Sequence, residues 1–376
     1  MSVSVAVEQD LFENPLGTDG FEFVEFTSPE PERLGGLFEQ MGFTAISRHR
    51  SKHVLRYAQG DINFLLNMEP QGQSADFRQA HGPSANAMAF RVRDAAKALK
   101  LAIERGATPV HGRVGPMELN IPAIEGIGGS NLYLVDRYGA QQIYDVDFVP
   151  LPGASERPAG VGLTYIDHLT HNVHRGRMAR WADFYERIFN FREIRYFDIE
   201  GAQTGLISKA MTSPCGKIRI PLNESRDEHS QIEEFLRDYR GEGIQHVALG
   251  TGDIFASVEA MRDQGVTFQD TPDTYYEALD ARLPGHGHNV QRLRADQVLI
   301  DGAPTKGQGL LLQIFTQNMI GPIFFELIQR EGNEGFGEGN FKALFESIEQ
   351  DQIRRGVLPA VAGPGPEPDL AKPHGA

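Results

Sequence analysis

The sequence has little cysteine and no long apolar run. Its one cysteine, Cys215, cannot form an internal disulfide or build a thiolate metal site, so we expect a reducing compartment. No run approaches the roughly eighteen apolar residues of a membrane span. The N-terminal stretch MSVSVAVEQD lacks the basic region and the apolar core of a signal peptide. These absences predict a cytoplasmic protein that has no membrane partner.

Positive charge is also scarce relative to negative charge. Lys and Arg number 36 against 51 Asp and Glu, which gives a formal net charge of −15. Such a chain repels phosphate backbones and anionic lipid, so nucleic acid is excluded as an expected partner. The 376 residues are enough for two or three domains, each with a sizeable core. We therefore expect an enzyme with a small-molecule substrate.

The chain contains an internal duplication. Residues 86–107, NAMAFRVRDAAKALKLAIERGA, align without a gap with residues 245–266, QHVALGTGDIFASVEAMRDQGV. Both segments predict a strand, a helix that begins after an N-cap (Asp94 or Asp253) and a glycine that ends it (Gly106 or Gly265). Repeats of this length imply two copies of one supersecondary unit.

Two further matches extend the duplication over the chain. GFEFVEF aligns with TYIDHLTH, and QIYDV aligns with FFELI as a predicted apolar strand with one acid. Each copy predicts the order β-α-β-β-β, and two such units make one half of the chain. We therefore predict an α+β fold of two tandem domains, residues 1–150 and 163–358. A linker rich in Pro, Gly and Ser would join them at 151–162, and the tail 359–376 would be disordered.

Three polar residues stand inside apolar strand-like runs of the second half. They are His168 in TYIDHLTHNV, His246 in GIQHVAL and Glu326 in IFFELIQR. Any one of them is more often a hydrogen-bonded core residue than a ligand. Three matching contexts favour a metal site, because a buried carboxylate needs a positive partner. Two imidazoles and one carboxylate form the facial triad typical of non-haem Fe(II) oxygenases. We expect one Fe(II) per chain.

The first half supports the metal interpretation by contrast. Phe23 aligns with His168 and Ala87 aligns with His246, while only Asp145, opposite Glu326, keeps an acid. The first half is therefore expected to bind no such metal. A histidine that the fold required would appear in both halves, so its absence from one half indicates a chemical role.

Other histidines and the late glycines are weaker candidates. His171 is predicted to lie on the opposite strand face from His168, and His286 and His288 fall in an apparent exposed loop. The glycine-rich stretch EGNEGFGEGNF lacks the G-K-S/T of a phosphate-binding loop and is acidic, so a nucleotide site is not expected. The helix predicted after it either covers a pocket or docks on the sheet.

Six segments together resemble the 4-hydroxyphenylpyruvate dioxygenase family of bacterial type: YIDHLTHNV, RIPLNE, GIQHVAL, GLLLQIFT, FFELIQR and GFGEGNF. The resemblance covers nearly the whole chain, and its specific motifs lie between Tyr165 and Phe341. It implies a vicinal-oxygen-chelate fold, in which paired β-α-β-β-β modules form an open barrel around the metal. It also implies Fe(II) held by His168, His246 and Glu326.

The same resemblance implies the substrate and its binding residues. The expected reaction converts 4-hydroxyphenylpyruvate and O2 to homogentisate and CO2 in tyrosine and phenylalanine breakdown, with the substrate supplying its own 2-oxo acid. The protein is expected to be a homodimer or a homotetramer. The implied substrate-binding residues are Ser208, Asn223, Gln231, Gln245, Gln313, Phe315, Phe336 and Phe341.

The sequence leaves three alternatives to this dioxygenase function open. Hydroxymandelate synthase uses the same metal and substrate, but Pro221, Asn223 and Phe341 favour the dioxygenase, because the synthase family commonly replaces them. An extradiol catechol dioxygenase would share the fold and the triad and would take a catechol. A metal-free protein that sequesters a small molecule would share the fold alone.

The Pro-rich tail lies outside the resemblance, so it should be dispensable for turnover. We expect a chain that ends at Pro364 to keep the dioxygenase activity of the full chain, measured as O2 consumption. A loss of activity in this truncated protein would contradict the prediction.

Overall fold

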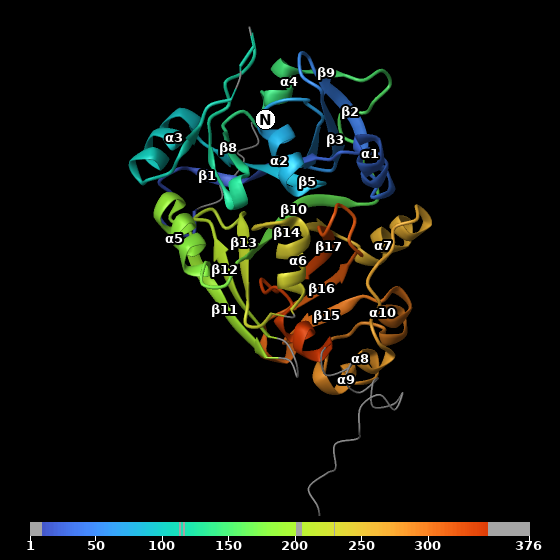
Figure 1. Ribbon diagram of the computed structural model, residues 1–376. Helices are drawn as coiled ribbons and strands as arrows, with labels where there is room; N and C mark the ends of the chain where they lie inside the picture. The colour runs from blue at the N-terminus through green and yellow to red at the C-terminus, as the bar shows by residue number, and fades with distance from the viewer. Residues whose placement is uncertain (1–9, 113, 116, 201–204, 229, 345–376) are drawn as a thin grey trace, which may run out of the picture.

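The computed structural model describes two β-sheets, one in each half of the chain (Figure 1). The described residues are 10–112, 114–115, 117–200, 205–228 and 230–344. The predicted disordered tail, 359–376, lies outside them. The first sheet and its helices lie in the upper part of Figure 1, and the second sheet and its helices lie below.

The first sheet has the strand order β6-β7-β8-β5-β1-β4-β3-β2-β9. Its strands are β1 (Thr18–Thr27), β2 (Thr44–His49), β3 (Val54–Gln59), β4 (Ile62–Asn67), β5 (Ser84–Val92), β6 (Pro109–Val110), β7 (Ala123–Glu125), β8 (Asn131–Val135) and β9 (Phe148–Pro150). Its helices are α1 (Pro31–Gln40), α2 (Gln73–His81), α3 (Ala95–Glu104), the short 3-10 helix η1 (Ile127–Gly129) and α4 (Ile143–Asp147).

The second sheet has the order β11-β12-β13-β10-β14-β17-β16-β15. Its strands are β10 (Leu163–Val173), β11 (Arg192–Glu200), β12 (Gly205–Thr212), β13 (Arg219–Ser225), β14 (Gly243–Thr251), β15 (Leu299–Gly302), β16 (Leu310–Phe315) and β17 (Phe324–Glu331). Its helices are α5 (Met178–Phe189), α6 (Gln231–Tyr239), α7 (Ile254–Asp263), α8 (Asp273–Glu277), α9 (Leu279–Arg282), α10 (Val290–Asp296) and η2 (Pro304–Lys306), with a last helix at 338–344. Within the described ranges, no helix combines the length and the apolar character needed to cross a membrane.

The two sheets repeat one topology, which confirms the predicted fold. Each half runs β-α-β-β-β twice, and its two modules meet at a central antiparallel pair, β1 with β5 or β10 with β14. Each central strand also pairs in parallel with the last strand of a module: β4 with β1, β8 with β5, β13 with β10 and β17 with β14. The boundary at 151–162 stays a prediction, although the sheets begin and end on either side of it.

The helix signals in the repeated segment are confirmed. Asp94 accepts a hydrogen bond from the backbone N–H of Lys97 at the start of α3, and Asp253 does the same for Ala256 at the start of α7. Gly106 and Gly265 follow these helices with φ of +88° and +90°, in the left-handed region that favours glycine.

The prediction that QIYDV forms a strand, with Asp145 opposite Glu326, is wrong. These residues form α4, and Asp145 accepts a hydrogen bond of 2.7 Å from the backbone N–H of Gln142 at the start of that helix. A five-residue apolar segment is too short for its period to distinguish a strand from a helical turn. The sheet register identifies Tyr133 as the counterpart of Glu326. Ala89 and Ala248 are aligned in the repeat, and Ala89 pairs with Tyr133 as Ala248 pairs with Glu326.

Aromatic packing joins the two halves into one core. Phe26 and Phe64 of the first sheet lie 6.4 Å and 5.9 Å, between ring centroids, from Phe325 of the second sheet. All three side chains are fully buried and belong to one hydrophobic cluster. Since interiors are packed at high density, a void at this junction destabilises both halves.

Replacing Phe64 by Ala removes the ring from this junction. We expect Phe64→Ala to lower the free energy of unfolding by about 3 to 5 kcal/mol, measured by urea denaturation. Leu11→Ala is the control, because the Leu11 side chain is 68% exposed. Equal unfolding midpoints for the two variants would contradict the proposed role of the junction.

His171 also packs between elements. Its Nε2 lies 2.7 Å from the Tyr185 hydroxyl on α5, and burial lowers the pKa of His171 from 6.5 to about 3. Because the unfolded chain takes up a proton near pH 6.5 while folded His171 stays neutral, stability falls as the pH drops from 6.5 towards 3.

We expect this residue to contribute up to about 1.4 kcal/mol per pH unit to that fall. In His171→Phe the slope of unfolding free energy against pH should be smaller over the same window, as measured by denaturation at several pH values. An unchanged slope would show that His171 titrates normally in the folded protein.

Candidate metal centre

Three neighbouring strands carry the predicted metal ligands to one place. β10, β14 and β17 are adjacent at the middle of the second sheet and carry His168, His246 and Glu326. In the sheet register, Ala248 of β14 lies between His168 and Glu326, and its small side chain leaves space above the strand. His246 precedes Ala248 by two residues and so points to the same face.

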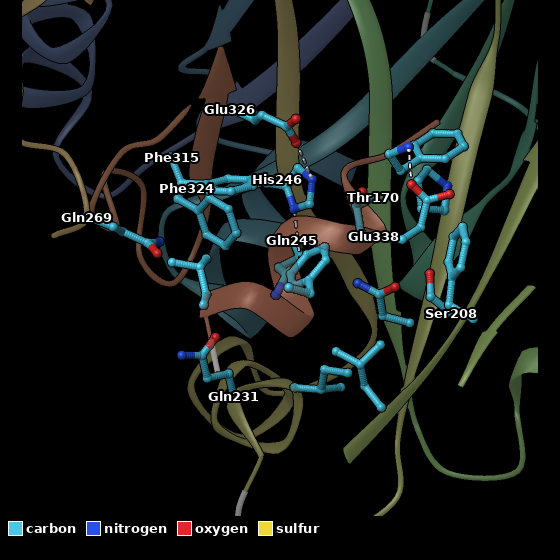
Figure 2. A pocket seen from close by; sticks show the side chains of 18 of the residues that line it. Thr170, Ser208, Gln231, Gln245, His246, Gln269, Phe315, Phe324, Glu326 and Glu338 are labelled. Atoms are coloured by element: carbon cyan, nitrogen blue, oxygen red, sulfur yellow. Dashed lines mark hydrogen bonds and ion pairs between the residues drawn. The ribbon is translucent and has the colours of Figure 1, made fainter. Parts of the chain in front are cut away.

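The ligand atoms of these three side chains converge. Glu326 Oε2 lies 3.2 Å from His168 Nε2 and 3.3 Å from His246 Nε2. The two Nε2 atoms are 3.4 Å apart. All three residues are buried, and Figure 2 shows His246 and Glu326 pointing towards each other.

The donor set fits a divalent metal. Glu326 Oε1 is buried and has no hydrogen-bond partner among the described residues. An unsatisfied buried carboxylate oxygen is costly, and a cation would compensate it. Two imidazole nitrogens and a carboxylate are ligands that suit a divalent transition metal and leave coordination positions open.

The electrostatics of the cluster favour an ionised carboxylate. Burial raises the pKa of Glu326, but the two imidazoles outweigh burial and hold it below its usual value. Burial lowers the pKa of His168 less than the carboxylates of Glu326 and Asp167 raise it, so the net shift is upward. For His246, burial prevails and the pKa is lowered. A charged carboxylate and a neutral imidazole are the forms that bind metals.

A cavity of about 280 Å³ opens above this cluster. Its lining combines apolar rings with a few amide and hydroxyl groups, as is usual for small-molecule sites. Helix α6, strands β12 to β14, β16 and β17 and the helix at 338–344 all contribute to it. Seven of the eight predicted substrate-binding residues line it: Ser208, Asn223, Gln231, Gln245, Phe315, Phe336 and Phe341.

Gln313 is the predicted residue that does not line the cavity. Its side chain is 1% exposed, and its Oε1 accepts a hydrogen bond of 3.3 Å from Asn340. Gly337, whose φ is +77°, lies directly against this amide, and a Cβ atom there would collide with it. In this structure Gln313 supports the segment that precedes the last helix.

Several residues that the sequence reasoning missed also line the cavity. Thr170 and Phe324 lie two residues from His168 and Glu326 on the same strands, so strand alternation was a usable signal. Gln269 and Asp270 lie in the loop after α7, and Glu338 lies at the start of the last helix. Figure 2 shows Gln269 and Glu338 at different sides of the cavity. No periodicity marks these loop positions.

The weaker histidine candidates lie apart from the cluster. His286 pairs with Asp280 at 3.0 Å and His288 pairs with Glu331 at 2.9 Å. His171 contacts Tyr185, as described above. In the described ranges, the group that brings three ligand atoms within 4.8 Å of one another is His168, His246 and Glu326.

Comparisons with known proteins agree with this arrangement. Residues 12–149 match the family model "Hydroxyphenylpyruvate dioxygenase, HPPD, N-terminal", and residues 165–280 match "Glyoxalase/Bleomycin resistance protein/Dioxygenase superfamily". A 4-hydroxyphenylpyruvate dioxygenase from Pseudomonas aeruginosa is 62% identical over 95% of this chain and 100% of its own length. Hemolysin VllY from Vibrio vulnificus is 63% identical over 92% of this chain and 98% of its own length.

A solved structure also shares the fold of this chain. A variant of 4-hydroxymandelate synthase from Streptomyces coelicolor superimposes with a TM-score of 0.76 at 26% identity, over 89% of this chain and 99% of its own. This chain and the synthase therefore share one architecture. Together with the full-length identity to the Pseudomonas enzyme, these findings place the chain in the 4-hydroxyphenylpyruvate dioxygenase family.

Proposed function

We propose that this protein is an Fe(II)-dependent dioxygenase that converts 4-hydroxyphenylpyruvate and O2 to homogentisate and CO2. The observation that carries the proposal is the buried group of His168, His246 and Glu326 at the base of a cavity of about 280 Å³. Identity of 62% to a Pseudomonas aeruginosa 4-hydroxyphenylpyruvate dioxygenase over nearly the whole chain supports the substrate.

His168, His246 and Glu326 are the proposed ligands of the iron, one ion per chain. When bound there, Fe(II) supplies open positions for the 2-oxo acid of the substrate and for O2 and provides the redox chemistry. The three side chains fix its place at the closed end of the cavity. Their burial keeps bulk water from the reacting atoms.

The remaining cavity residues bind and orient the substrate. Gln231, Asn223 and Ser208 offer amide and hydroxyl groups suited to the phenol, and Gln245 lies beside His246. Phe315, Phe324 and Phe336 surround the ligand cluster: the Phe324 ring stacks on His246 at 4.8 Å, and the Phe336 ring meets His168 edge-on at 5.3 Å. These rings give apolar contact to an aromatic substrate.

Hydroxymandelate synthase is the alternative that the site must be tested against. Pro221, Asn223 and Phe341, which favour the dioxygenase, all line the cavity. As lining residues they can contact the substrate, and their presence supports the dioxygenase over the synthase. Extradiol catechol cleavage and metal-free sequestration lack such an observation in their favour.

The proposal extends to the organisation of the protein. The chain divides at residues 151–162 into a metal-free domain and a catalytic domain. It assembles as a homodimer or a homotetramer in the cytoplasm. An acidic surface, with a net charge of −15, suits a small-molecule enzyme that binds no nucleic acid.

Reconstitution tests the reaction directly. The protein is loaded anaerobically with Fe(II), then 4-hydroxyphenylpyruvate and air are added, and the product is identified by mass and NMR. We expect homogentisate and CO2. 4-Hydroxymandelate would assign the synthase reaction, and the absence of O2 uptake would disprove both.

A ligand variant tests the metal centre. His246→Ala removes one of the three ligands, so we expect loss of Fe(II) binding and of turnover, measured by metal analysis and O2 uptake. His111→Ala, at an exposed histidine of the first half, is the control and should keep both. Unchanged substrate affinity without iron in the wild-type protein would instead support the sequestering alternative.

A further inference from the structure

A buried carboxylate that belongs to no role assigned so far lies behind one of the metal ligands. The Asp167 side chain is fully buried, and its Oδ1 lies 2.8 Å from His168 Nδ1, the ring nitrogen that faces away from Glu326. A hydrogen bond at Nδ1 fixes the tautomer and the orientation of an imidazole whose Nε2 binds a metal.

A β-bulge in β10 allows the Asp167 side chain to reach His168 Nδ1. Consecutive strand residues normally point to opposite faces, so Asp167 would ordinarily face away from the side of His168. Here Ile166 pairs with Leu249 and His168 pairs with Ala248, so β10 contains one extra residue, Asp167, relative to β14. Bulges of this kind re-aim a side chain and are common next to active sites.

Two arginines hold the carboxylate in place. Arg330 of β17 binds both oxygens, with Nε 2.7 Å from Oδ2 and Nη2 2.8 Å from Oδ1. Arg219 of β13 donates to Oδ2 at 3.4 Å. A bidentate guanidinium fixes the plane of a carboxylate as well as its charge, so Asp167 cannot rotate away from His168.

Arg330 also connects this contact to the cavity lining. Its Nη1 donates to the backbone carbonyls of Asn333 and Gly335, each at 2.8 Å. The next residue, Phe336, places its ring edge-on to His168. One guanidinium therefore holds both the carboxylate behind His168 and the turn that leads to the ring in front of it.

We infer that Asp167, held by Arg330, is a positioning residue of the metal centre, which accepts the Nδ1–H of His168 and so aims Nε2 at the metal. The inference rests on the proposed metal site. It predicts that the Asp167 carboxylate contributes to metal affinity as well as to stability.

The first half of the chain offers a matched control. Glu22 directly precedes Phe23, the counterpart of His168, and it too is the extra residue of a bulge, because Phe21 pairs with Phe90 and Phe23 pairs with Ala89. Glu22 is buried and pairs with Arg91 at 2.6 Å. Its carboxylate stands in the same place of the fold as that of Asp167, beside a phenyl ring instead of an imidazole, while its arginine comes from β5 and not from the last strand of a module.

The test is a titration of the metal-free, full-length protein with Co(II) alone, which resists oxidation and has visible absorption bands that report its coordination geometry. We expect Asp167→Asn to weaken Co(II) binding about 10- to 100-fold and to alter the bands. Glu22→Gln should lower the melting temperature but keep the Co(II) affinity within about twofold, because its carboxylate does not touch a ligand.

A second pair of variants covers the case in which Asp167→Asn does not fold. Arg330→Lys keeps a cation beside Asp167 but cannot bind both oxygens, so we expect Co(II) affinity to fall about three- to tenfold, against no change in Arg91→Lys. The inference is overturned if the folded variants of the second half bind Co(II) as the wild type does, or if the controls weaken binding equally. Failure of the wild type to bind Co(II) would instead disprove the proposed metal site itself.

Discussion

The register of three strands is the constraint on which the site depends. β10 and β17 flank β14, so the side chains of His168 and Glu326 rise on either side of Ala248, and His246 stands one pleat away. A shift of one residue in either pairing would move a ligand to the opposite face. The aromatic junction of Phe26, Phe64 and Phe325 fixes this register indirectly, since Phe325 occupies the face of β17 opposite Glu326.

Much of the fold could be predicted from the sequence because of the duplication. The strand and helix patterns are weak in each half alone, but the same patterns recur at aligned positions of both halves. Asp94 and Asp253 cap their helices through contacts with residues close in the chain, and so the sequence alone predicts these helix starts and the glycines that follow the helices. The prediction for QIYDV failed for the opposite reason: the strand that corresponds to β17 is β8, which is selected by its pairing with β5, a contact between residues distant in the chain. Tyr133 rather than Asp145 is therefore the counterpart of Glu326.

The candidate site likewise has residues that could be predicted from the sequence and residues that could not. His168, His246 and Glu326 share a strand context that is visible in the chain, and the structure brings them together. Gln269, Asp270 and Glu338 come from loops and a helix start, where nothing periodic marks them. Gln313 shows the limit of a motif: it lies on β16 two residues from Phe315, which lines the cavity, but Gly337 and Asn340 cover its amide. The bulge at Asp167 is likewise invisible to strict alternation.

The matched registers of the two sheets have a consequence for the first half. There, Asn67, Gln73 and Asn86 occupy the positions of Asn223, Gln231 and Gln245, and Glu25 replaces Thr170. Glu25 Oε1 accepts hydrogen bonds from Asn67 and Asn86 at 2.9 Å and 2.6 Å, and Gln73 accepts one from Asn86. Amides whose counterparts surround a cavity in the second half are thus joined in the first half, Asn67 and Asn86 through Glu25 and Asn86 directly to Gln73. In the first half these side chains therefore use their hydrogen-bonding groups within the fold itself.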